Sequence, residues 1–248
     1  MYSFRPVVRK DSWPVLVKNK LCGGVIYMQL DFSMMAKYMP YFFRSLGVTL
    51  KLTAASLLLG ILIAIPLSLI KLSKYKGIRA IGSFYTSIFR GVPLLVQVFV
   101  VYFGLPQILG LTFNAFQAGC LTFALNSAAY ISESLRGGIM AVDLGQREAA
   151  MSLGVPYGKM MKDIIFPQAI KSVMPSLINE FIGLMKNTTL ISTVGLVDVL
   201  RASQMVVSDT YRAFEPYITA AAFYYVLVMA ISFLGKQLEK WVNKSDQR

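Results

Sequence analysis

Asp143-Leu-Gly-Gln-Arg-Glu-Ala-Ala-Met-Ser-Leu-Gly154 is a polar stretch in a largely apolar sequence, and Val155-Pro156 follows it directly. Asp143 with Gln146 three residues later is typical of a capping box, and Glu148 adds negative charge to the expected first helical turn. Gly154 followed by Pro156 is a helix stop signal. The pattern predicts one short helix with defined ends.

The side chains of this predicted helix favour a surface to which another protein binds. Ala149 and Ala150 give it a face without bulk, so that a partner can approach the backbone closely. Met151 and Leu153 are apolar and suit a groove on that partner. An ordinary loop helix explains the same local features equally well, so both interpretations stay open at this point.

The spacing of further residues decides between the two interpretations. Glu148-Ala149-Ala150 is followed after three residues by Gly154, after nine more by Ile164, and then by Phe166-Pro167. This pattern resembles the EAA loop of bacterial ABC importer permeases, with Phe166 at a position where that family most often has Leu. The resemblance implies that residues 143–167 form a cytoplasmic coupling loop that docks into a cleft of an ATP-binding subunit. The implied coupling residues are Gln146, Glu148, Ala149, Ala150, Leu153 and Gly154.

Composition places this loop in a membrane protein. Of the 248 residues, 56% are hydrophobic, and the mean hydropathy is +0.58. Several apolar segments are long enough to span a bilayer, so we predict an all-α integral membrane protein. The net charge of +13 does not indicate nucleic-acid binding, because the basic residues mostly flank the apolar segments. The sequence has no histidine and no convincing catalytic constellation, so we expect neither an enzyme nor a metal site.

Five membrane-spanning helices are expected between a basic tail at residues 1–34 and a short C-terminal tail at 243–248. Within the transmembrane domain at 35–242, the expected spans are 48–72, 81–105, 111–131, 169–185 and 217–234. Arg90, Gly91 and Pro93 should break the second span into two half-helices. Residues 190–216 are amphipathic and should fold as short helices on the outer face.

The basic residues predict the orientation of the chain. The three segments expected in the cytoplasm hold four, five and four basic residues, whereas the two outer connections at 106–110 and 190–216 hold none and two. The positive-inside rule therefore predicts an N-terminus outside and a C-terminus inside the cytoplasmic membrane. The basic tail at 1–34 does not follow this rule.

Further stretches resemble the polar amino acid uptake branch of the same permease family. They are Arg90-Gly-Val-Pro-Leu-Leu-Val-Gln97, Leu125-Asn-Ser-Ala-Ala-Tyr130 with Glu133 and Arg136-Gly-Gly-Ile139, Pro167-Gln-Ala169, Asn179-Glu180 and Lys186-Asn-Thr-Thr-Leu190. The resemblance covers residues 34–242 and implies the type I importer architecture in a bacterial inner membrane. It also implies a second permease subunit in a homodimer or heterodimer, a dimer of ATP-binding subunits and an extracytoplasmic substrate-binding protein. The sequence contains no G-x-x-x-x-G-K-[ST] motif, so we expect ATP and magnesium on the partner subunit and no cofactor on this chain.

Polar groups at membrane depth are the candidates for a solute pathway, because such groups are costly in a bilayer and normally face a cavity or one another. They are Asn126, Glu180, Lys186, Asn187 and Thr188. Hydrogen bonding between helices explains Asn126 equally well.

The remaining signature residues fit structural roles better. Glu133 with Arg136 is typical of an ion pair on one helix face, and Arg90 is placed to satisfy carbonyls freed by the break at Gly91 and Pro93. Pro167 closes the coupling loop.

Residues 186–189 contain no acidic side chain that could accompany a cationic solute. Glu180 lies six residues from Lys186, which is not a facing helix spacing. We therefore expect an uncharged polar amino acid such as glutamine rather than arginine or lysine. The alternative function is an ion-coupled secondary transporter or a channel for small polar solutes. A secondary transporter usually carries an internal repeat, and we find none in this sequence.

Overall fold

The computed structural model describes residues 15–17, 26–28 and 30–243. Two short strands, β1 (Val15–Val17) and β2 (Ile26–Met28), pair antiparallel in the N-terminal tail. The other described elements are helical, which confirms the predicted all-α class apart from these two strands. In chain order they are α1 (Met35–Lys71), α2 (Lys76–Gly91), α3 (Leu94–Phe99), a π-helical turn (Val100–Gly104), α4 (Leu105–Leu109), α5 (Ala115–Ala141), α6 (Leu144–Ser152), α7 (Tyr157–Met160), a second π-helical turn (Met161–Ile165), α8 (Phe166–Asn187), a 3-10 helix (Thr188–Val194), α9 (Val199–Thr210) and α10 (Phe214–Asn243).

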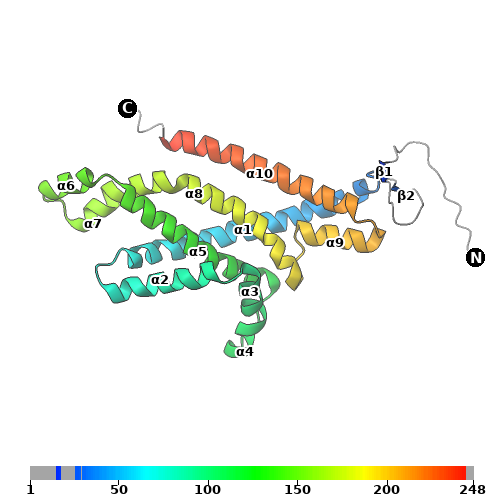
Figure 1. The fold of residues 1–248 in the computed structure, drawn as a ribbon, viewed down its shortest axis with the longest axis horizontal. Helices are drawn as coiled ribbons and strands as arrows, with labels where there is room; N and C mark the ends of the chain where they lie inside the picture. Colours follow the sequence, from blue (N-terminus) through cyan, green and yellow to red (C-terminus); the bar gives the residue numbers. More distant parts are fainter. Residues whose placement is uncertain (1–14, 18–25, 29, 244–248) are drawn as a thin grey trace, which may run out of the picture.

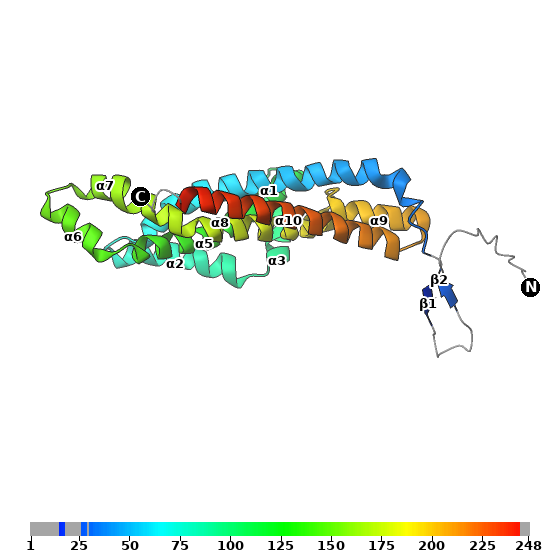
Figure 2. The ribbon, with the colours of Figure 1, turned by 90° about the horizontal axis from the view of Figure 1, so that it is seen from above.

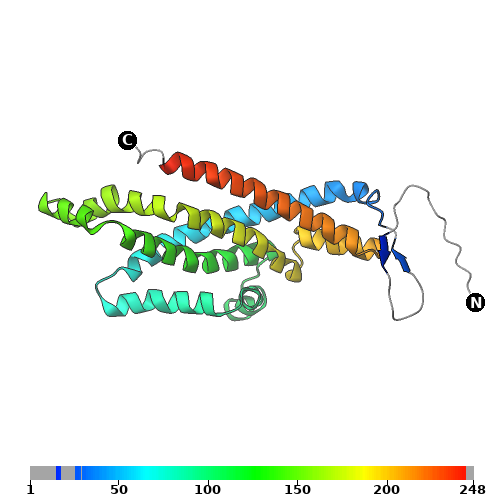
Figure 3. The same cartoon turned by 45° about the horizontal axis from the view of Figure 1, so that its top comes forward.

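The long helices α1, α5, α8 and α10 run along the length of an elongated molecule (Figure 1). α5 makes its most extensive contacts with α1 and then with α8, so it forms the centre of the bundle. Figure 2 shows α6 and α7 projecting at one end and the two strands lying at the other. Figure 3 shows α2 along one side of the bundle, turning sharply into α3.

Small side chains allow α5 to occupy this central position. Ala124 and Ala128 are buried, and a Cβ added to Gly60 of α1 would lie 3.1 Å from the Cβ of Ser127. The two backbones can therefore approach closely, which maximises van der Waals contact. Such contact stabilises helix pairs in a bilayer, where no hydrophobic effect operates between them.

Among the described residues, α1 and the segment Phe214–Val242 are each long and apolar enough to cross a membrane. Two pairs of helical segments, each bent at a short break, are long and apolar enough to cross a membrane if each pair is counted as one span. They are Lys76–Gly91 with Leu94–Leu109, bent by 103°, and Tyr157–Val194 with Val199–Thr210, bent by 47°. α5 lies between α1 and α8 and carries Asn126 and Ser132 among its buried residues. The total of five spans remains a prediction.

The first helix is longer than its sequence indicated. The expected first span, 48–72, covers only the later part of α1, which begins at Met35. The earlier part was not predicted as helix, because Lys37, Pro40 and Arg44 make it polar and irregular by composition alone. Tertiary packing decides otherwise, since Met35 and Phe42 are buried against residues of α9 and α10.

Two other expectations about the helices are confirmed. The break at residues 90–93 separates α2 from α3. Short helices are present in the expected range 190–216, namely the 3-10 helix and α9, although α10 already begins at Phe214; their place on the outer face stays a prediction. The fourth expected span, 169–185, is part of a longer helical segment, because the chain is helical without interruption from Tyr157 to Val194. The second π-helical turn comes directly before Phe166-Pro167, so the helix takes in this proline without ending there.

The segments that carry most of the basic residues lie at one end of the molecule. The α1–α2 connection, the region of α6 and α7, and the end of α10 lie at the left of Figure 1, whereas the start of α1 and the α9–α10 turn lie at the right. This arrangement agrees with a single basic face on one side of a membrane. Which side that is stays a prediction.

Candidate functional site

α6 begins with a different cap from the one its sequence indicated. Asp143 is the N-cap residue, and its Oδ1 accepts a hydrogen bond from the Gly145 amide at 2.6 Å. The expected capping box with Gln146 is wrong, because the short aspartate side chain bonds two residues ahead and the Gln146 amide donates to the Asp143 backbone carbonyl. Glu148 lies in the second turn rather than the first, since α6 begins at Leu144.

The predicted stop at Gly154 is confirmed. Its φ is +70°, its amide donates to the Met151 carbonyl at 2.9 Å, and the Val155 amide donates to the Ala150 carbonyl at 3.0 Å. This pair of hydrogen bonds is the Schellman motif. A Cβ added to Gly154 would meet no atom within 4 Å, so the backbone conformation alone requires glycine there.

Opposite faces of α6 have different surroundings. Ala150 is only 3% exposed and packs with Ile139, Met160 and Ile165, so the expectation that it forms an open face together with Ala149 is wrong. Ala150 faces inward because the Schellman turn folds the following segment back over it. Four large apolar side chains on or directly beside α6 are exposed: Leu144, Met151, Leu153 and Tyr157. Leu153 is the most exposed of them, at 82%. The coupling candidates Gln146, Glu148 and Ala149 are exposed as well.

Arg147 ties α6 to the end of α5. One of its terminal nitrogens donates to the Ile139 carbonyl at 2.6 Å. Together with the buried cluster around Ala150, this bond fixes how α6 stands relative to the bundle. α6 is therefore attached to the end of α5 by both a hydrogen bond and apolar packing.

Three cavities are lined by residues of α5 and α8, and we call this set of cavities the α5–α8 groove. It contains a lower cavity of about 500 Å³ next to Asp143, a middle cavity of about 280 Å³ and an upper cavity of about 400 Å³ next to the break in the second span. The middle and upper cavities share Arg90, Tyr130 and Glu180.

One face of α8 supplies polar side chains to all three cavities. They recur every four residues, which places them on one side of the helix: Gln168, Ser172, Ser176 and Glu180. Our sequence interpretation included Glu180 but missed the other three. The four-residue spacing of polar residues within a membrane helix is the signal that would have found them.

The upper cavity is lined by side chains of opposite charge, Arg90 and Glu180. The Arg90 guanidinium lies over the Tyr130 ring, 5.1 Å from its centroid. Glu180 accepts a hydrogen bond from the Ser127 hydroxyl at 2.6 Å, and Asn187 completes the lining. Residues 186–189 contain no acidic side chain, but Glu180 lines the same cavity as Asn187, so an acidic group does stand near Asn187.

Gln97 and Asn126 satisfy the carbonyls freed by the break after α2. The Gln97 amide donates to the carbonyls of Phe89 at 2.9 Å and Val92 at 2.8 Å, and Asn126 donates to Phe89 at 2.8 Å. The role that we gave to Arg90 is therefore wrong, because its side chain points to Tyr130 instead. We assigned no role to Gln97, although it lies four residues after Pro93, where an α-helical turn brings it back to the break.

Lys186 and Thr188 do not lie in the groove cavities. Lys186 is exposed and lines neither the middle nor the upper cavity, and Thr188 is fully buried with its hydroxyl donating to the Met185 carbonyl at 2.7 Å. Of the five expected pathway residues, the structure brings together Asn126, Glu180 and Asn187. Pro167 lies in the first turn of α8.

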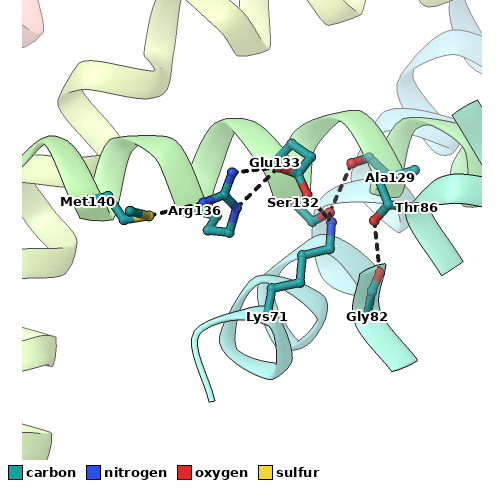
Figure 4. Close-up of polar contacts among 8 residues, drawn as sticks. All are labelled: Lys71, Gly82, Thr86, Ala129, Ser132, Glu133, Arg136 and Met140. Atoms are coloured by element: carbon teal, nitrogen blue, oxygen red, sulfur yellow. Dashed lines mark hydrogen bonds and ion pairs between the residues drawn. The ribbon is translucent and has the colours of Figure 1, made fainter. Parts of the chain in front are cut away.

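Glu133 and Arg136 form the predicted ion pair, but a third residue joins it. Arg136 donates to Glu133 Oε2 at 2.9 Å, and Lys71 at the end of α1 donates to Glu133 Oε1 at 2.8 Å (Figure 4). Lys71 is one of the four basic residues after the first span that we counted on the cytoplasmic side. It is buried between helices.

The fold and the site together define a class of protein: a helical membrane protein with polar cavities between a broken helix and a projecting helix. Residues 30–244 match the family described as "Binding-protein-dependent transport system inner membrane component", and the chain belongs to this family. The resemblance to the amino acid branch of ABC importer permeases is thereby confirmed.

Relatives with assigned names are permease subunits of transport systems. The chain is 46% identical over 219 residues to the arginine transport system permease protein ArtQ of Bacillus subtilis, covering 88% of this chain and all of the relative. It is 48% identical over 193 residues to the putative glutamine transport system permease protein GlnP of Rickettsia felis, covering 78% and 88%.

Solved structures show the same fold. A chain from the crystal structure of an amino acid ABC transporter with histidines matches at a TM-score of 0.81 and 44% identity, covering 86% of this chain and 99% of the other. A chain of the inward-facing MetNI methionine ABC transporter matches at 0.72 with 19% identity, which supports the fold alone.

Proposed function

We propose that this protein is the pathway-forming permease subunit of an ABC importer that carries a polar amino acid across a bacterial cytoplasmic membrane. ATP and magnesium bind to a partner subunit, whose hydrolysis of ATP drives transport. A dimer of such ATP-binding subunits, a second permease subunit and an extracytoplasmic substrate-binding protein complete the assembly. The names of its relatives, which include arginine and glutamine permeases, support the amino acid class.

The structure of α6 is the observation that carries this proposal. The helix projects from the end of the bundle, and Leu144, Met151 and Leu153 stand exposed next to charged Glu148. Exposed apolar side chains framed by polar ones mark a protein-binding surface rather than a lipid-facing one. Because Arg147 and Ala150 anchor α6 to α5, docking of a partner there would move the wall of the α5–α8 groove.

The charges of the upper cavity suit an amino acid. Arg90 can receive an α-carboxylate, and Glu180 can receive an α-ammonium group. A zwitterion therefore balances the two charges, and Asn126 and Asn187 remain for a polar side chain. A cationic side chain would need a further acidic partner, since an uncompensated charge at membrane depth is costly. Uncharged polar amino acids such as glutamine therefore remain the preferred solutes, now because of the charges of Arg90 and Glu180.

The test of this function is reconstitution of the complex with two matched glycine variants. Gly154→Val forces a β-branched residue into the left-handed region, which costs at least about 1–2 kcal/mol and should weaken ATPase-subunit binding roughly tenfold or more. Gly158→Val changes a glycine that lies nearby in equally open surroundings without a positive φ. We expect ATP-dependent uptake of labelled glutamine, cystine, glutamate or arginine in the natural protein and in Gly158→Val, and its loss in Gly154→Val.

Three measurements accompany the uptake assay: membrane insertion, co-purification of the ATPase subunit and ATP hydrolysis. Normal insertion with lost co-purification in Gly154→Val supports the coupling role of α6. If co-purification and hydrolysis stay at normal levels in Gly154→Val, the docking function of α6 is wrong. Uptake that follows an ion gradient and needs no ATP would instead establish the secondary transporter.

A further inference from the structure

Lys71 is a basic residue held inside the bundle. Its side chain is only 2% exposed, and its Nζ donates to Ser132 Oγ at 2.7 Å and to Glu133 Oε1 at 2.8 Å. Room for the chain comes from Gly82 of α2, where an added Cβ would lie 2.8 Å from Lys71 Cγ. Figure 4 shows the lysine reaching from the end of α1, past Gly82, to α5.

The carboxylate that Lys71 reaches has a second partner. Arg136 donates to Glu133 Oε2 through Nε at 3.1 Å and through a terminal nitrogen at 2.9 Å. Both oxygens of Glu133 are thus engaged by cations, and two positive charges against one negative charge give this group a net charge of +1. We call Lys71, Glu133 and Arg136 the basal triad.

The basal triad is part of the wall of the α5–α8 groove. Glu133 lines the middle cavity together with Arg90 and Glu180. The formal charges of Arg90 and Glu180, which line the same cavity, sum to zero, so the net formal charge of the charged groups named here is that of the basal triad. Within the triad only Lys71 is buried, since the side chains of Glu133 and Arg136 are 28% and 36% exposed. A buried charge is screened less by water and salt than an exposed one, so the charge of Lys71 acts on an ion in the middle cavity.

We propose that Lys71 is a specificity-determining residue that disfavours cationic amino acids in the α5–α8 groove. It does so by occupying one oxygen of Glu133 and by supplying the buried positive charge that makes the basal triad net positive. Without Lys71 the triad is neutral, and Glu133 is free at one oxygen to accept a hydrogen bond from a cationic side chain. This inference rests on the proposed function, because it takes the groove to be the amino acid pathway.

The test compares binding of labelled arginine and labelled glutamine to the permease with its ATP-binding subunit in nanodiscs. The variants are Lys71→Met, Glu133→Gln and the double variant Lys71→Met/Glu133→Gln, whose triads carry net charges of 0, +2 and +1. The ratio of arginine to glutamine affinity should rise roughly fivefold or more in Lys71→Met and fall by a similar factor in Glu133→Gln. The double variant should return to within about twofold of the natural ratio, because its net charge is restored.

The double variant also separates an effect of the net charge on binding from an effect of lost structural support. It removes the ion pair without leaving Lys71 buried and unpaired, so its comparison with Lys71→Met stays valid even if Glu133→Gln, which takes the carboxylate away from the buried Lys71, fails to fold. If the pair only holds the helices together, folded variants bind less tightly but keep the natural ratio, and that result overturns the proposal. If the natural complex binds neither amino acid, the proposed pathway itself is contradicted.

Discussion

Gln97 shows how one side chain stabilises a broken helix at membrane depth. Its amide group donates to two carbonyls, of Phe89 and Val92, that Gly91 and Pro93 leave without helical partners. A bilayer offers no water for such carbonyls, so an internal donor is required. Asn126 of α5 adds a third hydrogen bond and accordingly links the break to the central helix.

Replacing Gln97 with methionine should therefore destabilise the protein. Methionine has a similar shape but no donor, and a buried acceptor without a partner costs about 1–3 kcal/mol. We expect the purified complex to melt several degrees lower than the natural one. Gln237→Met, at an exposed position of α10, is the matched control and should leave the melting temperature unchanged. Equal melting temperatures for both variants would show that Gln97 does not support the break.

At the scale of elements, the contact between α5 and α8 depends on one of two adjacent glycines. A Cβ on Gly138 would lie 2.4 Å from Val173 Cγ2 and 3.0 Å from the Ala169 carbonyl oxygen, whereas a Cβ on Gly137 would meet nothing within 4 Å. Gly138 thus sets how closely the walls of the α5–α8 groove approach. Gly137 faces open space on the same helix.

Alanine at these two positions should have opposite effects. Gly138→Ala forces α5 and α8 apart and should cost about 1–3 kcal/mol, while Gly137→Ala should be neutral or stabilise the helix by up to about 1 kcal/mol. Thermal unfolding of the two purified variants measures the difference. A stable Gly138→Ala variant with normal uptake would mean that the close approach of α5 and α8 is dispensable.

At the scale of the whole molecule, both the fold and the charge pattern distinguish two ends. α6, the α1–α2 connection and the end of α10 gather at one end, together with basic residues such as Lys74, Lys159 and Lys236. The other end carries Tyr211, which is 94% exposed. The positive-inside rule predicts that the first end is cytoplasmic, with the N-terminus outside and the C-terminus inside.

Cysteine labelling in intact cells checks this orientation. In a background with Cys22→Ser and Cys120→Ala, Tyr211→Cys should react with an impermeant maleimide added outside, because it lies at the outer end. Leu153→Cys on α6 should react only after the membrane is opened. The reverse pattern would contradict the orientation, while labelling of both positions from outside would contradict the assignment of two membrane faces.

The sequence by itself determined the features that depend on a few neighbouring residues. Gly154 ends α6 because only glycine adopts φ of +70° without strain, and Gly91 with Pro93 breaks the second span because proline removes a hydrogen bond. Composition established the membrane class, and the spacing of Glu148, Gly154 and Pro167 indicated the family. Each of these features depends on neighbouring residues or on the overall composition, so it can be predicted without knowing the fold.

Only the tertiary structure decided which side chains meet. Lys71 lies 62 residues from Glu133, and Glu180 lies 53 residues from Ser127, yet each pair forms a hydrogen bond of 2.8 Å or less. The burial of Ala150 and the length of α1 were likewise set by packing against other helices. Such contacts depend on how the helices pack in three dimensions. No short-range sequence pattern specifies that packing, because two helices can pack in many relative positions that bury a similar apolar surface area.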